Sequence, residues 1–539
     1  MIDTNIAFAN GDQWRNVSGK GLPKPVFNII KRIKQFKIAS LKSNNITLSF
    51  QPMEYRETNQ DEQMRANIHY SDLANAEVKN ILEKVNFDSK SRQMLSDAYD
   101  SGDFCIHWFF NIDKQPYKQK YPQIVGEIDA EILDGQNVMF GNPNIRDVER
   151  QPYIIIVGRD LVKNLQKEYI ANHENDKDGA SLITDDAETN YQAGDNGKIE
   201  LEADDFGKAL FIIKYFKKDG KVFANKSVQN MYIYQNKNTG YDYYPLAFNN
   251  WESVKGSYHG RAETTGIIPN QIAINKMFAM VIYHLMLTAF PTAVYNADKV
   301  ENWSNEIGAA IPLTNLQVGE SIRNVAGYLE PASMSGQIMN AIELAMQYTK
   351  ECLGISDASL GNVNPDNTSA IIAVQKANVV PLENVRANLY EFVEDCGRII
   401  LDMMATNYGV RPVVVTDGQN RSIESFDFTK LKGLWLNIKA DVGTASYFSE
   451  ISSMQTLDNL LNAGRIEFID YLKRIPDEII PQKQELIQSL EMKDYRTQAL
   501  YNLMAKFMDQ LPSELQAKLK QMQPEEMEQE VLRLMGANE

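Results

Sequence analysis

One stretch of the chain has the residue types and spacing of a calcium-binding loop. In "ENDKDGASLITD", Glu174, Asp176, Asp178 and Gly179 hold the first, third, fifth and sixth positions. Alternate carboxylates can surround Ca²⁺, and the glycine permits a sharp turn. The twelfth position, however, is Asp185, where a longer glutamate normally supplies two oxygens. A solvated acidic loop is therefore favoured, and a calcium site is the alternative.

Residue patterns typical of catalysis are missing from the sequence. It contains no G-x-x-x-x-G-K-[ST], G-x-G-x-x-G, G-x-S-x-G or H-E-x-x-H pattern. Its five histidines are scattered, and none has a carboxylate and a nucleophile at suitable spacing. The sequence therefore predicts a structural or binding protein, not an enzyme, with no cofactor and no metal.

Composition narrows the class of protein further. The 539 residues are 43% apolar and 23% charged, as in soluble globular proteins, and their length suggests about three domains. With 55 basic and 71 acidic side chains, the net charge of −16 disfavours a surface that grips nucleic acid throughout. Cys105, Cys352 and Cys396 lack the spacing of disulfides or a metal site, which indicates reduced thiols. The first residues lack the basic and apolar regions of a signal peptide, so we expect a cytoplasmic product.

A long helix broken by a proline is the most informative expected element. It covers 369–407, with the break at Pro381. Beyond the proline, apolar residues recur at steps of three and four, which predicts a narrow coiled-coil-like seam that needs a partner. The seam comprises Leu382, Val385, Leu389, Phe392, Cys396, Ile399 and Met403. The opposite face is acidic, with Glu383, Glu391, Glu394, Asp395 and Asp402.

Other segments give clear local predictions. Residues 61–101 read as two helices, and a hairpin is expected around Asp219-Gly220. The apolar segment 277–290 is too short to span a membrane and is expected to be a buried helix. Residues 20–42 carry seven Lys or Arg and no acid, and are either a phosphate-facing patch or a solvated helix face. Strands are expected in 103–158 and 411–443, and a loop at the start of the chain.

The ordered set of these parts resembles the portal proteins of tailed bacteriophages. The resemblance rests on "SYHGRAETTGIIPNQIAINKMFAM" (257–280), "LGNVNPDNTSAIIAVQ" (360–375) and the proline that follows. It also rests on "GDQW" with "PKPVFNIIKRI" near the start and on "TLDNLLNAGRIEFIDYLKRIP" (456–476). The acidic segment 174–205 departs from the family pattern and has no assigned role.

The resemblance implies a mixed α+β, mainly helical portal fold with named parts. They are a wing (1–260 with 408–446), stem helices (268–290 and 337–353), a clip (291–336), a tunnel loop (355–368), the long kinked helix (369–407) and a helical crown (447–539). Portals form rings, usually of twelve subunits, at one vertex of the capsid, and double-stranded DNA passes through the ring.

The tunnel loop and the clip hold the expected site residues. A conduit must not clamp phosphates, since each such contact adds affinity and slows passage. The loop suits this, because it is polar or acidic and its nearest cation is Lys376. The loop residues are Gly361, Asn362, Asn364, Pro365, Asp366, Asn367 and Thr368. In the clip, Trp303, Ile311 and Leu313 are the expected docking residues. An ordinary connector on the outside is the alternative for the loop.

The resemblance also implies partners and a location. It predicts docking of the large terminase subunit and of a head–tail adaptor, contacts with major capsid and scaffold proteins, and no membrane. The protein would be made in the host cytoplasm and end in the virion, at the portal vertex. The alternatives are a metal-dependent nuclease or motor subunit of the packaging machinery, and a calcium-binding capsid protein.

Overall fold

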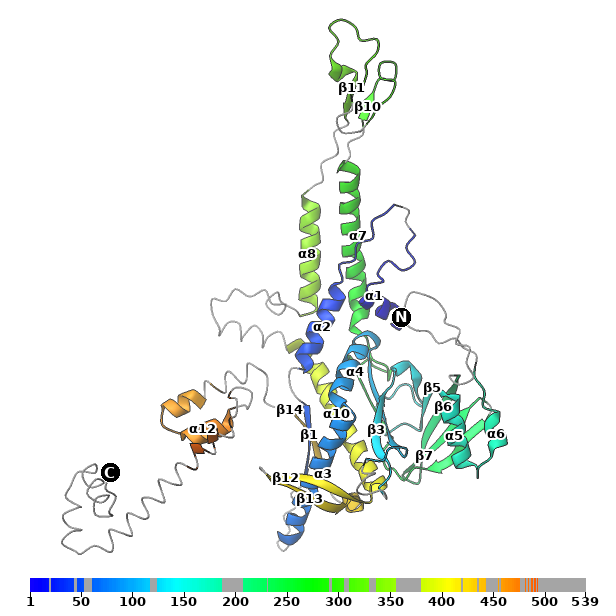
Figure 1. Ribbon diagram of the computed structural model, residues 1–539, viewed down its shortest axis with the longest axis vertical. Coiled ribbons are helices and arrows are strands. Elements are labelled where there is room, and N and C mark those ends of the chain that lie inside the picture. Colours follow the sequence, from blue (N-terminus) through cyan, green and yellow to red (C-terminus); the bar gives the residue numbers. More distant parts are fainter. Residues whose placement is uncertain are drawn as a thin grey trace, which may run out of the picture. The chain divides into compact units, whose positions relative to one another are not determined.

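The structure is a computed structural model whose described residues fall into two compact units. They are 1–18, 21–42, 46–52, 61–116, 124–186, 207–229, 231–289, 293–304, 310–328, 336–354, 380–417, 420–433, 436–442, 454, 457–475, 480, 483, 486–487, 489–490 and 492. The units are Met1–Gly443 and Thr444–Glu539, and each is described by itself. Helices and strands both contribute to the first unit, so the predicted mixed α+β class is confirmed (Figure 1).

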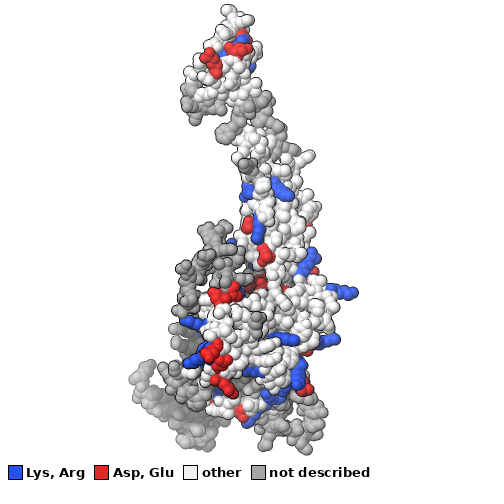
Figure 2. Space-filling model, turned by 90° about the vertical axis from the view of Figure 1, so that its right-hand side faces the viewer, with Lys and Arg blue, Asp and Glu red and all other residues white. Residues whose placement is uncertain are grey.

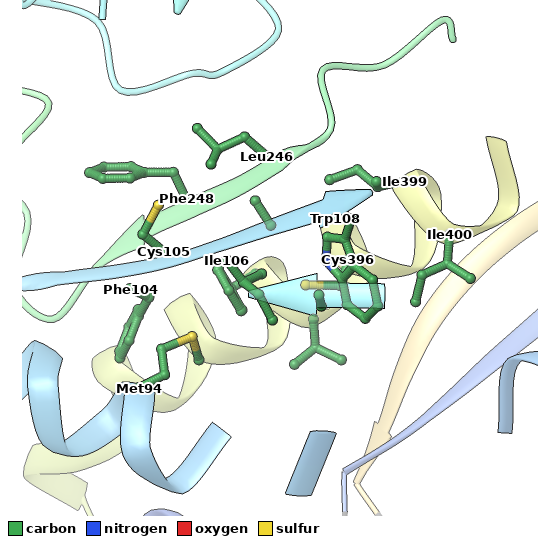
Figure 3. Close-up of a cluster of buried hydrophobic side chains, with 14 of the residues drawn as sticks. Met94, Phe104, Cys105, Ile106, Trp108, Leu246, Phe248, Cys396, Ile399 and Ile400 are labelled. Atoms are coloured by element: carbon green, nitrogen blue, oxygen red, sulfur yellow. The ribbon is translucent and has the colours of Figure 1, made fainter. Parts of the chain in front are cut away.

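The core of the first unit is built around a three-stranded antiparallel sheet. β2 (Asp103–Asn111) is its central strand, between β3 (Glu127–Ile132) and β9 (Leu246–Asn250). The near-continuous apolar run of β2 is typical of a strand covered on both faces, and its first six residues are buried. Helix α4 (Phe87–Ser101) packs against this sheet. Figure 3 shows side chains of β2, β9, α4 and α10 (Glu383–Asn407) meeting in this core.

Helix α10 (Glu383–Asn407) confirms the predicted seam, because all seven seam residues are buried. Its buried face is wider than a coiled-coil seam, since Val393, Ile400 and Met404 are buried too. The partner of the seam is the same chain: α10 packs on β2, β9 and β14 (Leu436–Val442). Asp402, predicted on the exposed face, is buried and accepts hydrogen bonds from the N–H groups of Asp242 (2.6 Å) and Tyr243 (3.0 Å).

A five-stranded antiparallel sheet forms the second layer of strands. Its order is β4 (Val138–Phe140), β5 (Tyr153–Leu161), β6 (Lys208–Lys218), β7 (Lys221–Val228) and β8 (Met231–Asn238). The predicted hairpin between β6 and β7 is confirmed, with Asp219 at φ 53° and Gly220 at φ 77°, as a tight turn requires. Helix α5 (Val162–Asn172) packs on β5 and β8, and the short α6 (Lys177–Ser181) packs on α5.

Strands distant in sequence close the rest of the first unit. β1 (Ile46–Pro52) pairs antiparallel with β14 (Leu436–Val442), and β12 (Val410–Asp417) pairs with β13 (Asn420–Asp427). Helix α3 (Asp61–Lys84) packs against β1 and β12. The predicted strands are present, but no local pattern in the sequence indicates that β1 and β14 pair.

The N-terminal segment is more structured than expected. Residues 2–10, predicted as a loop, form helix α1 (Ile2–Asn10), which ends at Gly11 in the left-handed conformation. The basic residues of α2 (Ile29–Lys42) turn toward acids of the same chain. Lys34 pairs with Asp100 (2.6 Å), and Lys37 pairs with Glu263 and is buried. These lysines therefore hold the fold together and are occupied by carboxylates.

Two helices stand side by side on this body (Figure 1). Helix α7 (Glu263–Ala289) begins five residues before the predicted start and continues through Pro269. Helix α8 (Gln337–Cys352) matches its prediction closely. The chain between them contains a two-stranded antiparallel sheet of β10 (Ala293–Tyr295) and β11 (Ala326–Tyr328).

In the second unit, the described residues include helix α12 (Phe468–Arg474). The Tyr471 hydroxyl donates a hydrogen bond to Asp458 (2.5 Å), and Leu472 is buried. The helical crown predicted for 447–539 lies mostly outside the described residues.

Candidate assembly surfaces

Helices α7 and α8 expose a broad apolar surface in the single chain, and Figure 2 shows mostly uncharged surface with scattered charges in this region. Large apolar side chains on both helices are 38–61% exposed. They are Met280, Tyr283, Leu285, Met286 and Leu287 on α7, with Ile338, Met339, Leu344 and Tyr348 on α8. The expectation that 277–290 is a buried helix is wrong for most large side chains in its described part: Ala279 and Val281 are buried, but the five α7 residues just named are exposed in the single chain. Among the described residues, α7 is also the one helix long and apolar enough to cross a membrane, by length and composition only.

The base of α7 is fixed by buried polar side chains. Gln271 donates to the Phe27 carbonyl (2.7 Å) and accepts from the Ile29 N–H (3.0 Å). Asn275 donates to Gln13 (2.6 Å). An apolar helix tolerates such buried amides only when they are paired. The N-terminal segment thus anchors the lower half of α7 and leaves the upper half free of described partners other than α8.

The carboxylate of Asp103, in the core sheet, binds the segment that enters α7. Asp103 is buried and accepts hydrogen bonds from the Gly260 N–H (2.8 Å) and the Asn250 side chain (2.9 Å). His259 Nδ1 lies 2.7 Å from the other oxygen of the same carboxylate. The direction of α7 relative to β2 is therefore set by specific bonds.

The predicted docking residues lie in the small β10–β11 region. Trp303 stacks on Tyr295, with centroids 5.6 Å apart, and meets Tyr328 edge-on. Ile311 and Leu313 are half-buried. The neighbouring Val318 and Ile322 are far more exposed, so they contribute more apolar surface than the predicted residues do.

The two ends of the described chain around the predicted tunnel loop meet at one point. Gly354 has φ +66°, and a Cβ atom built there would lie 2.6 Å from Cγ of Pro381. Leu353 beside it packs on the main core. Pro381 lies in the 3-10 turn Val380–Leu382 that precedes α10. The described residues on the two sides of 355–379 therefore lie next to each other.

The expected tunnel-loop residues themselves, from Gly361 to Lys376, lie outside the described residues. So does the first part of the helix expected at 369–407, and the kink at Pro381 stays a prediction.

The family of the chain follows from its similarity to a family model. A sequence model of the phage P22-like portal protein family matches residues 76–537, which is most of the chain. The chain belongs to this portal family. No curated protein matches it. Membership makes it a phage portal protein by family, with a role in a ring assembly at the capsid vertex.

In the segment predicted as a possible calcium loop, Asp176 forms hydrogen bonds that stabilise the local fold. Asp176 caps α6 by accepting a hydrogen bond from the Gly179 N–H (2.9 Å), and Tyr169 donates to its other oxygen (3.3 Å). Across the described part of the chain, no three His, Cys, Asp or Glu side chains gather as metal ligands would. Nothing there favours the nuclease or calcium-binding alternatives.

A charged cleft of about 540 Å³ lies along α10. Arg146 approaches Glu391 (3.3 Å), which also accepts from the Asn249 side chain (2.9 Å). Burial raises the pKa of Asp395 to about 6, which Arg398 opposes and Glu391 reinforces. These groups pair with one another and so form a structural network in the portal fold.

Sequence reasoning missed the surfaces that depend on distant contacts. The local sequence does not show which groups Gln271 and Asn275 bind, or that Asp103 binds the segment that enters α7. The signal available was a pair of amides within an apolar helix, which require partners when buried.

Proposed function

We propose that this protein assembles into a ring, with twelve copies expected, that serves as the conduit for double-stranded DNA during packaging and ejection. The observation that supports this most strongly is the apolar surface of α7 and α8, which a single chain leaves in water. Exposed apolar patches of this kind mark interaction sites. In a ring, each copy covers this surface of its neighbour through a closed heterologous contact.

The parts of the fold take the roles that the family suggests. In this proposal α7 and α8 are the stem, residues 291–336 the clip, and 355–368 the tunnel loop. The wing comprises 1–260 with 408–446, residues 369–407 form the long kinked helix, and 447–539 form the crown. The antiparallel sheets and α10 then supply the frame on which the stem stands.

The adjacency of Gly354 and Pro381 supports the tunnel-loop assignment. A segment that leaves and returns at one anchored point can reach into a channel without loosening the frame. Its side chains, including Asn362, Asn364 and Asn367, would touch phosphates without binding them strongly, because they carry no positive charge.

The β10–β11 region is the proposed docking site for the large terminase subunit and later for a head–tail adaptor. Trp303, which contacts Tyr295 and Tyr328, offers an aromatic surface, and Ile311 and Leu313 of the same region are the other proposed docking residues. Capsid and scaffold proteins are the other proposed partners, at the portal vertex of the virion. The ring is proposed to have no ATPase of its own.

Deletion of residues 361–367 tests the conduit. The variant should form rings like the wild-type protein but package or retain less DNA in particles. A matched variant with seven of these residues replaced by Gly and Ser keeps the loop length and separates reach from side-chain chemistry. Normal packaging by the deletion variant would remove the role assigned to the loop.

A further inference from the structure

The five-stranded sheet has one face that no described residue covers. Strand alternation sends Ile154, Ile156 and Ile213 inward, to the buried core. The opposite side chains belong to neither of the two buried clusters of the described residues. We call this face, formed by the outward side chains of β4 to β8, the outer sheet face. It includes Met139, Tyr153, Ile155, Val157, Arg159, Leu210, Ile212, Lys214, Phe216, Lys218, Lys221, Phe223, Asn225, Ser227 and Tyr232.

The outer sheet face is apolar across neighbouring strands. Cross-strand register places Val157 opposite Ile212 and Tyr153 opposite Phe216. Phe216 in turn stacks on Phe223, with centroids 5.9 Å apart. Tyr232 is 50% exposed, Met139 48% and Ile212 38%. Sheets normally bury such a face against another layer.

The charges on the outer sheet face are all positive. Lys214 lies over the Tyr153 ring, 4.7 Å from its centroid, and Lys218 is exposed at the end of β6. Neither lysine forms an ion pair with a described residue. Arg159, by contrast, is paired with Asp186. No outward position of these strands holds an acid, although the whole chain carries a net charge of −16.

We propose that the outer sheet face is the docking surface for an acidic amphipathic helix of another protein. The apolar stripe from Leu210 to Phe216 is about 20 Å long at ~3.3 Å per residue. A helix of about 14 residues spans that length. Its apolar side would cover Ile212 and Phe216, and its carboxylates would reach Lys214 and Lys218. A nucleic acid is the poorer fit, although Tyr153, Phe216 and Tyr232 add aromatic rings to the face. Aliphatic side chains (Ile155, Val157, Leu210 and Ile212) occupy its middle strands, and only Lys214 and Lys218 are available there for phosphates.

The proposal is independent of the DNA conduit, and α7 and α8 take no part in it. Its probe is an 18-residue fluorescent peptide with Leu and Ile on one helical face and Glu on the other. A second peptide replaces every Glu by Lys. Fluorescence anisotropy with the full-length protein should show at least about tenfold tighter binding of the Glu peptide, which corresponds to a difference of ~1.4 kcal/mol.

Substitutions then locate the surface. Lys214→Glu with Lys218→Glu should reverse the preference toward the Lys peptide, and Ile212→Ser should weaken both peptides about tenfold. Matched controls are Lys177→Glu and Leu182→Ser, exposed positions outside the sheet, and they should leave binding unchanged. Circular dichroism verifies that each variant is folded.

Several outcomes would overturn the proposal. They are equal binding of both peptides, binding of neither, or displacement of the Glu peptide by a single-stranded oligothymidine. Two more point to another occupant. One is binding only after residues 188–205 are replaced by a Gly–Ser linker, which assigns the face to that segment of the chain. The other is cross-linking of an Ile212→Cys variant between two copies, which assigns it to a neighbouring subunit.

Discussion

Replacing Gly354 by alanine should strain the point where the proposed tunnel segment leaves the fold. Gly354 has φ +66°, a conformation that costs a residue with a Cβ about 1–2 kcal/mol. The added methyl group would also lie 2.6 Å from Cγ of Pro381, far inside contact distance. Relieving that overlap, between a half-buried glycine and an exposed proline ring, costs roughly 1–2 kcal/mol more. We therefore expect Gly354→Ala to lower the free energy of unfolding by about 2–4 kcal/mol in total.

Urea unfolding followed by tryptophan fluorescence measures this change, because Trp108 and Trp251 are buried in the first unit. The matched control is Gly336→Ala at the other end of α8, where a Cβ meets nothing within 4 Å and φ is −59°. Pro381→Ala removes Cγ, so in combination with Gly354→Ala it should recover the part of the loss that comes from the overlap. The backbone part should remain.

The functional readout is DNA retention in assembled particles. Because Gly354 and Pro381 anchor both ends of residues 355–380, Gly354→Ala particles should form but lose packaged DNA. Equal stability of the Gly354→Ala and Gly336→Ala proteins, or no coupling between positions 354 and 381, would refute the reasoning. So would full DNA retention by the Gly354→Ala particles.

Three further predictions concern assembly, pH and the acidic segment. Leu287→Asp should abolish rings in native mass measurements, yet it should change the stability of the single chain by less than ~0.5 kcal/mol because the side chain is already exposed. Leu182→Asp is the control and should leave rings intact, whereas ring formation by Leu287→Asp would contradict the stem assignment. Burial raises the pKa of Asp395 to about 6, above its unfolded value, so the charged form opposes folding. Asp395→Asn should therefore gain stability over wild type as the pH rises from about 4 to 7, by under ~1 kcal/mol because the side chain is a third exposed. A constant difference in stability across this pH range would argue against this prediction. Asp176→Ala should cost about 1 kcal/mol through the lost cap of α6 without changing calorimetric calcium titrations, whereas calcium binding that depends on Asp176 would revive the calcium-loop interpretation.

The predictable parts of the fold are those set by local pattern. The seven seam residues of α10 and the Asp219-Gly220 turn follow from spacing and backbone preference, and the structure confirms both. The pairing of β1 with β14 joins residues almost 400 positions apart, which no local pattern encodes. Asp402 looked exposed from helical position alone, and its burial depends on N–H groups of a distant loop.

The sequence predicts where the helices of the candidate surfaces lie along the chain, but it does not predict which of their side chains are exposed. The α7 and α8 helices follow from apolar periodicity, but the exposure of Leu285 and Leu287 depends on which neighbours are missing in one chain. The basic character of α2 was equally visible in the sequence. The role of these basic residues depends on distant acids, because Lys34 pairs with Asp100 and Lys37 pairs with Glu263.

The most direct measurement of the central claim is the mass of the purified protein together with negative-stain images viewed along its axis. We expect a ring with an open centre and a mass near twelve times that of the 61.2 kDa chain. A stable monomer whose α7 and α8 stay exposed, or a compact particle without a central opening, would contradict it.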